Sequence, residues 1–220
     1  MTTIPFWIDS APIKRFPTLR RNINVDVLVI GAGITGITTA YLLAKEGLTV
    51  GLIERERVAS IDTGHTTAHL TYVTDVALHE LAGNFGNDHA QAAWDAGAAG
   101  IDEIERIVQE EEIQCEFTRA PGYLHACVDG FSEEEISSLK REARLAAKLG
   151  FGATYLERVP YFSVPGVRFP NQAKFHPRKY LRALVMKLSR NDSRVFEKSA
   201  VTEFDAGKTP RKNQWSLDRF

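Results

Sequence analysis

The chain has 220 residues, a formal net charge of −1, 44% hydrophobic residues and 25% charged residues. These proportions are typical of a globular protein with room for one large domain or one and a half ordinary ones. The near-zero charge gives no reason to expect nucleic acid or an anionic membrane as a partner. No apolar run approaches a membrane span and the N-terminus does not read as a signal peptide, so a cytoplasmic location is expected.

Prolines interrupt residues 1–22, which predicts an N-terminal arm that lies on a domain surface. Its aromatic residues, Phe6, Trp7 and Phe16, are expected to be the side chains that the arm buries.

The segment from Val25 to Glu54 has the pattern of a dinucleotide-binding βαβ unit. The apolar run 25–30 predicts a strand buried on both faces, and 50–53 predicts the second strand. Glu54 follows that strand and lies 23 residues after Gly31, close to the spacing at which an acid accepts hydrogen bonds from a ribose diol.

Three glycines between the first strand and the helix have distinct predicted roles. Gly31 permits a tight turn, Gly33 lets a pyrophosphate approach the backbone, and Gly36 lets the helix pack closely on the sheet. The helix dipole adds a favourable potential for an anion at this end. The backbone N–H groups expected to face the phosphates belong to Ile34, Thr35 and Gly36.

Residues 55–75 are rich in hydroxyl side chains and contain two histidines, His65 and His69. Four residues apart, they could form a metal pair, with Asp62 and Asp75 as the nearby further ligands. The favoured alternative is a loop that faces a cofactor, with one histidine bonded locally, because this ligand set is poor for zinc. No metal is therefore expected.

Helical spacing of apolar residues predicts one helix over about 76–113. Residues 115–128 are predicted to form two short strands around a Pro–Gly turn. A capping box formed by Ser132 and Glu135 predicts a helix that stops at Gly150.

Residues 151–175 contain three prolines, which predicts loops and an edge strand. A helix is predicted from Pro177 to about Arg190, because proline is favoured in a first helical turn. A strand over 194–204 and a turn with a return strand over 208–220 complete the predicted elements.

Four stretches of the chain together resemble a known family. They are VDVLVIGAGITGITTAYLLAKEGLTVGLIER, TGHTTAHLTYVTD, CEFTRAPGYLHA and FPNQAKFHPRKYLRAL. The chain resembles the N-terminal part of FAD-dependent oxidoreductases of the D-amino-acid oxidase and glycine oxidase superfamily, closest to the type with a C-terminal Rieske domain. The resemblance covers nearly all of residues 6–205.

The resemblance implies an α/β fold, with a Rossmann-like FAD/NAD(P)-binding βαβ domain and part of an α+β substrate domain. The implied organisation is an N-terminal arm at 1–22, a first FAD-binding segment at 23–80, a partial substrate or cap domain at 81–174, and a truncated return to the FAD-binding domain at 175–220.

The resemblance also implies FAD as the cofactor, bound by residues at matching positions. The implied contacts are Gly31, Gly33, Ile34, Thr35 and Gly36 with the pyrophosphate, Glu54 with the adenosine ribose, Arg55 with the adenine or its ribose, Thr66, Thr67 and Ala68 near the pyrophosphate and flavin ring, and Val201 with adenine through its backbone.

The implied function is hydride transfer from an amine- or hydroxyl-bearing carbon of a small amine or amino-acid substrate to the flavin. Family members need a further C-terminal stretch that supplies most substrate-facing residues, so no catalytic residue is assigned. The sequence has no Cys-x-His pair and cannot itself hold a Rieske cluster. A missing C-terminal half or a Rieske-type electron-transfer protein is the partner expected for such a truncated or split chain.

Two other functions remain open at this stage. An NAD(P)-dependent dehydrogenase would use the same βαβ unit, although further alternating βα units would then be expected after it. A non-catalytic remnant, or a subunit completed by a partner chain, would leave an exposed sheet edge.

Overall fold

The computed structural model describes residues 4–188 and 193–203, which form two compact units. Unit 1 comprises the described residues within Met1–Thr67, Ile113–Cys115 and His176–Phe220, and unit 2 comprises Ala68–Glu112 and Glu116–Phe175. Residues 68–80, expected from the sequence in the first FAD-binding segment, therefore belong to unit 2. Among the described residues, no helix combines the length and apolarity needed to cross a membrane.

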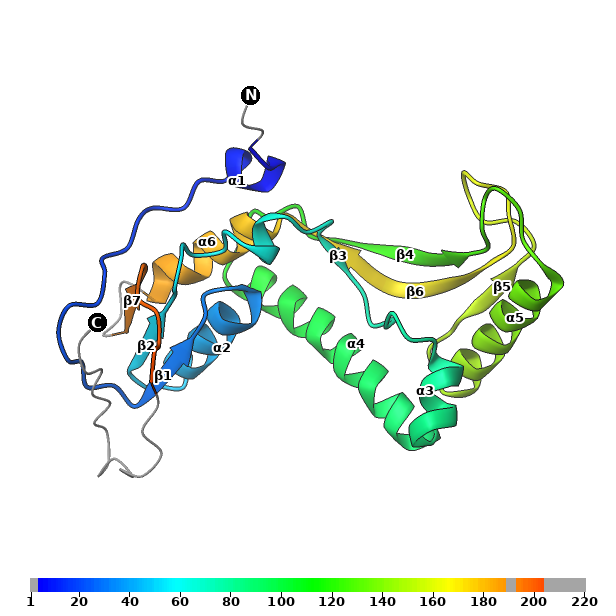
Figure 1. Cartoon of the computed structure of the whole chain (residues 1–220), viewed down its shortest axis with the longest axis horizontal. Helices are drawn as coiled ribbons and strands as arrows, with labels where there is room; N and C mark the ends of the chain where they lie inside the picture. The colour runs from blue at the N-terminus through cyan, green and yellow to red at the C-terminus, as the bar shows by residue number, and fades with distance from the viewer. Residues whose placement is uncertain (1–3, 189–192, 204–220) are drawn as a thin grey trace. The chain divides into compact units, whose positions relative to one another are not determined.

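Unit 1 is built on a three-stranded parallel sheet with the order β1-β2-β7. Helices α2 and α6 contact each other and lie side by side (Figure 1). The fold class expected from the sequence is therefore present as a mixed α/β unit. Its elements are α1 (Phe6–Ser10), β1 (Val27–Ile30), α2 (Ile34–Lys45), β2 (Val50–Ile53), the 3-10 turn η1 (Asp62–Gly64), α6 (Pro177–Leu188) and β7 (Arg194–Phe196).

Strand β2 is buried along its whole length, as a central strand of a parallel sheet should be. The expectation that β1 is also buried on both faces is wrong, since Ile30 is 58% exposed. Among the described residues β1 pairs with β2 alone, which makes it a sheet edge. The small cluster of Leu19, Ile23, Val25 and Ile53 packs the end of the N-terminal arm against the sheet.

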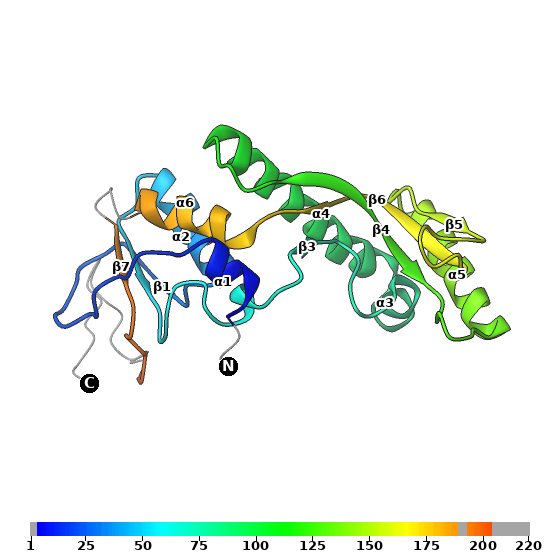
Figure 2. The ribbon, with the colours of Figure 1, turned by 90° about the horizontal axis from the view of Figure 1, so that it is seen from above.

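Unit 2 is an antiparallel sheet covered by helices. Strand β6 pairs with each of β3, β4 and β5, and helices α4 and α5 pack against β6 (Figure 2). The core includes Trp94 of α4 and Phe169 of β6, whose rings meet edge to face at 5.6 Å. The elements are β3 (His69–Leu70), α3 (Leu78–Phe85), α4 (Asn87–Glu110), β4 (Thr118–His125), α5 (Glu133–Lys148), β5 (Thr154–Leu156) and β6 (Gly166–Lys174).

The single helix predicted over 76–113 is wrong, because the chain forms α3 and α4 with a break at Gly86. Gly86 has φ of 86°, a left-handed conformation that ends one helix and that glycine adopts without steric cost.

The two short strands predicted at 115–128 are one strand, β4. The edge strand predicted at 151–175 is present as β5, which within the described part of the chain pairs with β6 alone, and the same region also contains the central strand β6, which was not expected. The register shifts between Ala120 and Gly122, where Pro170 and Asn171 of β6 lie opposite a single residue of β4. Such a bulge leaves one residue out of the ladder, so a proline there costs no strand hydrogen bond.

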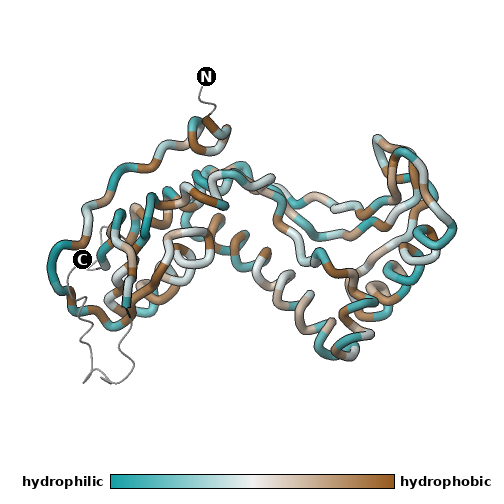
Figure 3. Tube along the Cα trace, viewed as in Figure 1, coloured by the Kyte–Doolittle hydropathy of each residue, from teal (hydrophilic) through white to brown (hydrophobic). Residues whose placement is uncertain are grey.

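Helix α5 begins as predicted, with the Ser132 hydroxyl accepting a hydrogen bond from the Glu135 N–H at 3.2 Å. The other half of the predicted capping box differs, because the Glu135 carboxylate accepts a hydrogen bond from the Cys127 N–H at 2.9 Å. Hydrophilic and hydrophobic residues both recur along α5 (Figure 3), as expected of a helix with one buried and one exposed face. Helix α6 begins at Pro177 as predicted. The strand predicted over 194–204 ends at Phe196, and the turn and return strand over 208–220 lie outside the described residues.

Glu142 of α5 is 1% exposed and caps helix α3 from outside that helix. Its carboxylate accepts hydrogen bonds from the N–H groups of Leu78 and His79 and from the His79 ring. We expect Glu142→Ala to lower the free energy of unfolding by about 2–4 kcal/mol, because it leaves buried N–H groups without acceptors. Urea unfolding measures the loss, and Glu134→Ala, exposed on the same helix, should change stability little; equal effects would contradict the capping role.

Asp26 stabilises the start of the β1–β2 pair through two hydrogen bonds from Thr49, at 2.9 and 2.6 Å. The bond from the Thr49 hydroxyl, followed by the bond from its N–H, lowers the pKa of the Asp26 carboxyl from 3.8. A lowered folded-state pKa contributes stability that is present above the unfolded value and is lost as pH falls through the folded value. The stability difference between wild type and Asp26→Asn should therefore shrink in acid below about pH 4.

Chemical unfolding at a series of pH values between about 6 and 2 tests this prediction. Asp129→Asn, at an exposed carboxyl, serves as the control. A difference between wild type and Asp26→Asn that stays constant through the acid range would refute the assignment.

Candidate functional site

The turn between β1 and α2 brings the start of a helix against the end of a strand. Gly31 has φ of 96°, which a side chain would disfavour. A Cβ placed on Gly36 would lie 1.9 Å from the Gly31 carbonyl oxygen, so the predicted packing role of Gly36 is confirmed. Gly33 precedes α2 and offers no side-chain cap, so the N–H groups of the first helical turn lack the partners that an intrahelical bond or a cap would give.

Glu54 lies at the end of β2 and turns its carboxylate back toward the same turn. One carboxylate oxygen accepts a hydrogen bond from the Ala32 N–H at 2.8 Å, and the other accepts one from the Glu56 N–H at 2.7 Å. Each carboxylate oxygen can accept two hydrogen bonds, so both keep an acceptor site for a diol. An uncapped helix start beside a fixed carboxylate fits the phosphate and ribose groups of a dinucleotide.

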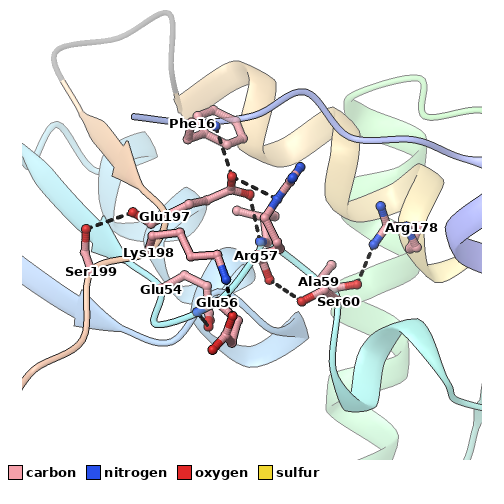
Figure 4. A network of polar contacts seen from close by, with 11 residues as sticks. Phe16, Glu54, Glu56, Arg57, Ala59, Ser60, Arg178, Glu197, Lys198 and Ser199 are labelled. Carbon is pink, nitrogen blue, oxygen red and sulfur yellow. Dashed lines mark hydrogen bonds and ion pairs between the residues drawn. The ribbon is translucent and has the colours of Figure 1, made fainter. Parts of the chain in front are cut away.

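A buried carboxylate, that of Glu197, holds the segment that follows Glu54 (Figure 4). Its oxygens accept hydrogen bonds from the Val58 N–H at 2.9 Å and the Phe16 N–H at 3.2 Å. The Arg57 guanidinium forms an ion pair with the same carboxylate at 3.0 Å. Glu197 thereby joins the N-terminal arm, the loop after β2 and the end of β7.

A buried guanidinium, that of Arg178, supports the same loop from helix α6. It donates to the carbonyl oxygens of Ala11 at 3.1 Å and Ala59 at 2.6 Å. Burial, followed by the positive charge of Arg57, lowers the pKa of Arg178, while Glu197 opposes the shift. The Ala59 N–H in turn donates to the Ala32 carbonyl at 2.9 Å, so the support reaches the glycine turn.

The hydroxyl-rich segment reaches the glycine turn through Thr63, whose hydroxyl lies 3.5 Å from the position of a Cβ on Gly33. Thr66 is half-buried and Thr67 is exposed. Ala68 is buried, has φ of 61°, and is the first residue of unit 2.

Two other predicted contact residues lie in unit 1. Arg55 is exposed immediately after Glu54. Val201 was expected in a strand but lies beyond the end of β7, and its side chain packs against the cluster that contains Ile53. The chain turns at Lys198, with φ of 51°, and the Ser199 N–H donates to the Glu54 carbonyl at 2.9 Å.

The histidines of the hydroxyl-rich segment do not gather with other ligands. The His65 ring bonds locally to the Ile61 carbonyl at 2.7 Å. Within residues 4–188 and 193–203, no three His, Cys, Asp or Glu side chains are placed to hold a metal ion. Sequence reasoning missed Glu197 and Arg178, whose roles depend on partners more than 100 residues away along the chain.

A cavity of about 530 Å³ lies in unit 2, and none of the predicted contact residues lines it. Its charged lining includes Arg119, which is paired with Asp102 and Glu105 at 2.6 Å each. A guanidinium already paired in this way is a poor anion site, so the cavity does not replace the glycine turn as the candidate cofactor site.

Comparison with known proteins places the whole arrangement in a family. The sequence profile of the family described as FAD dependent oxidoreductase matches residues 26–217. YhfW of Bacillus subtilis (strain 168), named as a Rieske 2Fe-2S iron-sulfur protein, is 34% identical over 207 residues, which are 93% of this chain and 40% of that protein. Gamma-glutamylputrescine oxidoreductase of Escherichia coli (strain K12) is 24% identical over 202 residues, 86% of this chain and 45% of that protein.

Solved structures show the same fold. L-amino acid deaminase from Proteus vulgaris matches with a TM-score of 0.65 and 14% identity, over 88% of this chain and 45% of that one. Glycine oxidase from Geobacillus kaustophilus matches with a TM-score of 0.61 and 16% identity, over 84% of this chain and 49% of that one. The chain thus spans less than half the length of each of these relatives.

The contact between Gly36 and Gly31 gives a direct test of the turn. We expect Gly36→Ala to lower the free energy of unfolding by about 1–3 kcal/mol or more, because the new methyl group meets backbone rather than a movable side chain. Gly100→Ala is the matched control, since Gly100 lies in α4 with nothing within 4 Å of a Cβ. That control should stabilise the helix by about 0.5–1 kcal/mol. Thermal unfolding of both variants measures the contrast, and a neutral Gly36→Ala would contradict the packing.

Proposed function

Because this chain belongs to the family of FAD-dependent oxidoreductases, we propose that its unit 1 binds the ADP half of FAD. The observation that carries the proposal is the uncapped start of α2 beside the Glu54 carboxylate. Backbone N–H groups of Ile34, Thr35 and Gly36 would hold the pyrophosphate, with Gly31 and Gly33 shaping the turn.

The remaining proposed contacts are with the adenosine and flavin parts of the cofactor. Glu54 would accept hydrogen bonds from the adenosine ribose, and Arg55, exposed beside it, would lie near the ribose or adenine. The Thr66, Thr67 and Ala68 backbone would run toward the flavin end, and the Val201 backbone would meet adenine. The proposal needs no cationic side chain in contact with the phosphates, because the backbone N–H groups at the start of α2 already supply hydrogen-bond donors.

For the whole protein we propose oxidation of a small amine or amino acid. The relatives named as glycine oxidase, L-amino acid deaminase and gamma-glutamylputrescine oxidoreductase support this substrate class. When bound, FAD accepts a hydride from a carbon that bears an amine or a hydroxyl group. The described residues supply binding and orientation, and substrate-facing groups are proposed to come from the part of the family architecture that this chain does not span.

The likeness to YhfW supports a further proposal, that a Rieske-type iron–sulfur domain or protein is the electron-transfer partner. Neither Cys115 nor Cys127 forms a disulfide, which suits the proposed reducing, cytoplasmic compartment. A nicotinamide dehydrogenase is disfavoured because the chain leaves β2 for the antiparallel sheet of unit 2 rather than for another βα unit.

A visible absorbance spectrum before and after incubation with FAD tests the proposal. A flavin spectrum that remains through gel filtration supports a cofactor site within this chain. Calorimetry with FAD and with NADH then separates the two nucleotide classes. A chain that binds NADH and never FAD would overturn the proposal.

Glu54→Gln should raise the Kd for FAD by about tenfold, because a neutral amide replaces the charged acceptor of the ribose hydroxyls. The amide oxygen can still accept one of the two backbone hydrogen bonds, from Ala32 or from Glu56. The thermal midpoint of the flavin-free chain should therefore fall by no more than the few degrees expected for one lost hydrogen bond. Glu56→Gln is the matched control, since Glu56 forms an ion pair with Lys198 at the surface. Equal FAD affinity for all three chains would show that Glu54 does not contact the cofactor.

A further inference from the structure

The N-terminal helix α1 rests on the loop that follows β2. Ile8 packs directly on Gly64, because a Cβ built on Gly64 would lie 3.0 Å from the Ile8 Cδ1 and 3.1 Å from the Ala59 carbonyl oxygen. Only a residue without a side chain leaves room for this contact. Gly64 of the η1 turn is therefore packed between Ile8 of the arm and the backbone of Ala59.

Trp7 makes the polar contact between α1 and the same loop. Its indole Nε1–H donates to the Thr66 carbonyl oxygen at 2.6 Å. The indole ring also meets the buried His176 ring edge to face, with centroids 4.8 Å apart at 72°. Trp7 is thus fixed by packing and in turn fixes the backbone of the hydroxyl-rich segment.

Ser10 and His176 hold the far end of α1, in an arrangement that is structural rather than nucleophilic. The Lys179 N–H donates to His176 Nδ1 at 3.3 Å, which places the ring proton on Nε2, 3.0 Å from the Ser10 hydroxyl oxygen. The Ser10 hydroxyl donates to the Phe6 carbonyl at 2.5 Å. His176 therefore donates to Ser10 and does not accept its proton, so the pair is not a catalytic dyad.

We propose that Trp7 is a positioning residue of the FAD site, holding the Thr66 carbonyl so that the 62–67 loop is ordered before the cofactor binds. The inference rests on the proposed function. Two backbone hydrogen bonds of the loop are local, from Gly64 to Ile61 and from His65 to Asp62, and these two do not tie it to the sheet. An external anchor removes the ordering cost that a free loop would add to binding.

Hydrogen exchange on the flavin-free chain tests the contact itself. Trp7→Phe keeps an aromatic ring against His176 and removes the N–H donor, so the amides of Gly64 and His65 should exchange faster. Gly64→Ala disturbs the neighbouring contact between Ile8 of α1 and the loop, so it should also make the His65 amide exchange faster. Asp9→Ala, exposed on the same helix, is the matched control and should exchange as wild type does.

Titration with FAD tests the positioning role. Trp7→Phe should raise the Kd about three- to tenfold, the effect of one lost hydrogen bond, and should change the visible circular dichroism of the bound flavin. The thermal midpoint of the flavin-free chain should stay within a few degrees of wild type, which separates positioning from a general loss of stability.

Three results would overturn the inference. Unchanged exchange at Gly64 and His65 in both variants would show that α1 does not anchor the loop. Faster exchange with unchanged FAD affinity and dichroism would show an anchor without a role in binding. A wild-type chain that binds no FAD would overturn the proposed function, and with it the positioning role, although the exchange data would still show the contact.

Discussion

The approach of α2 to the turn before it is the constraint on which the rest of unit 1 depends. A side chain on Gly36 would collide with the Gly31 carbonyl, so the helix can start this close to the strand only because Gly36 has no Cβ. Gly31 contributes through its positive φ of 96°, which glycine adopts without strain. The close start brings the uncapped N–H groups of α2 next to the carboxylate at the end of β2. Donors for phosphate and an acceptor for a diol are thereby held together without a cation.

Two buried charged side chains keep this arrangement in place. Glu197 and Arg178 bond mainly to backbone groups of loops rather than to each other. A buried charge is costly unless it is hydrogen-bonded, and backbone groups in buried loops need partners that a helix or strand would otherwise supply. The buried charges and the backbone groups of the loops satisfy each other's need for hydrogen bonds. The irregular segment between β2 and the hydroxyl-rich loop is thereby held in one conformation.

The prolines and periodicities of unit 2 show where local patterns mislead. Pro170 suggested an edge strand, yet it lies in the central strand β6, at a bulge where a missing N–H has no consequence. The same bulge orients the Pro170 carbonyl to accept a hydrogen bond from the Tyr72 hydroxyl at 2.8 Å. Gly86 divides a stretch in which local spacing predicts one helix, because its left-handed conformation lets the chain end α3 and begin α4 in a new direction.

The sequence by itself determined the βαβ unit, the roles of Gly31 and Gly36 and the Ser132 cap, because each depends on residues close together in the chain. It also determined the family, through four separate stretches that can each be recognised locally. The contact residues it nominated for FAD remain a prediction. Tertiary structure alone decided that Glu197, Arg178 and Trp7 support the candidate site, since their partners lie tens to more than a hundred residues away. Helix and turn signals are local free-energy preferences, whereas a buried hydrogen bond between distant segments exists only once the fold has removed water from both partners.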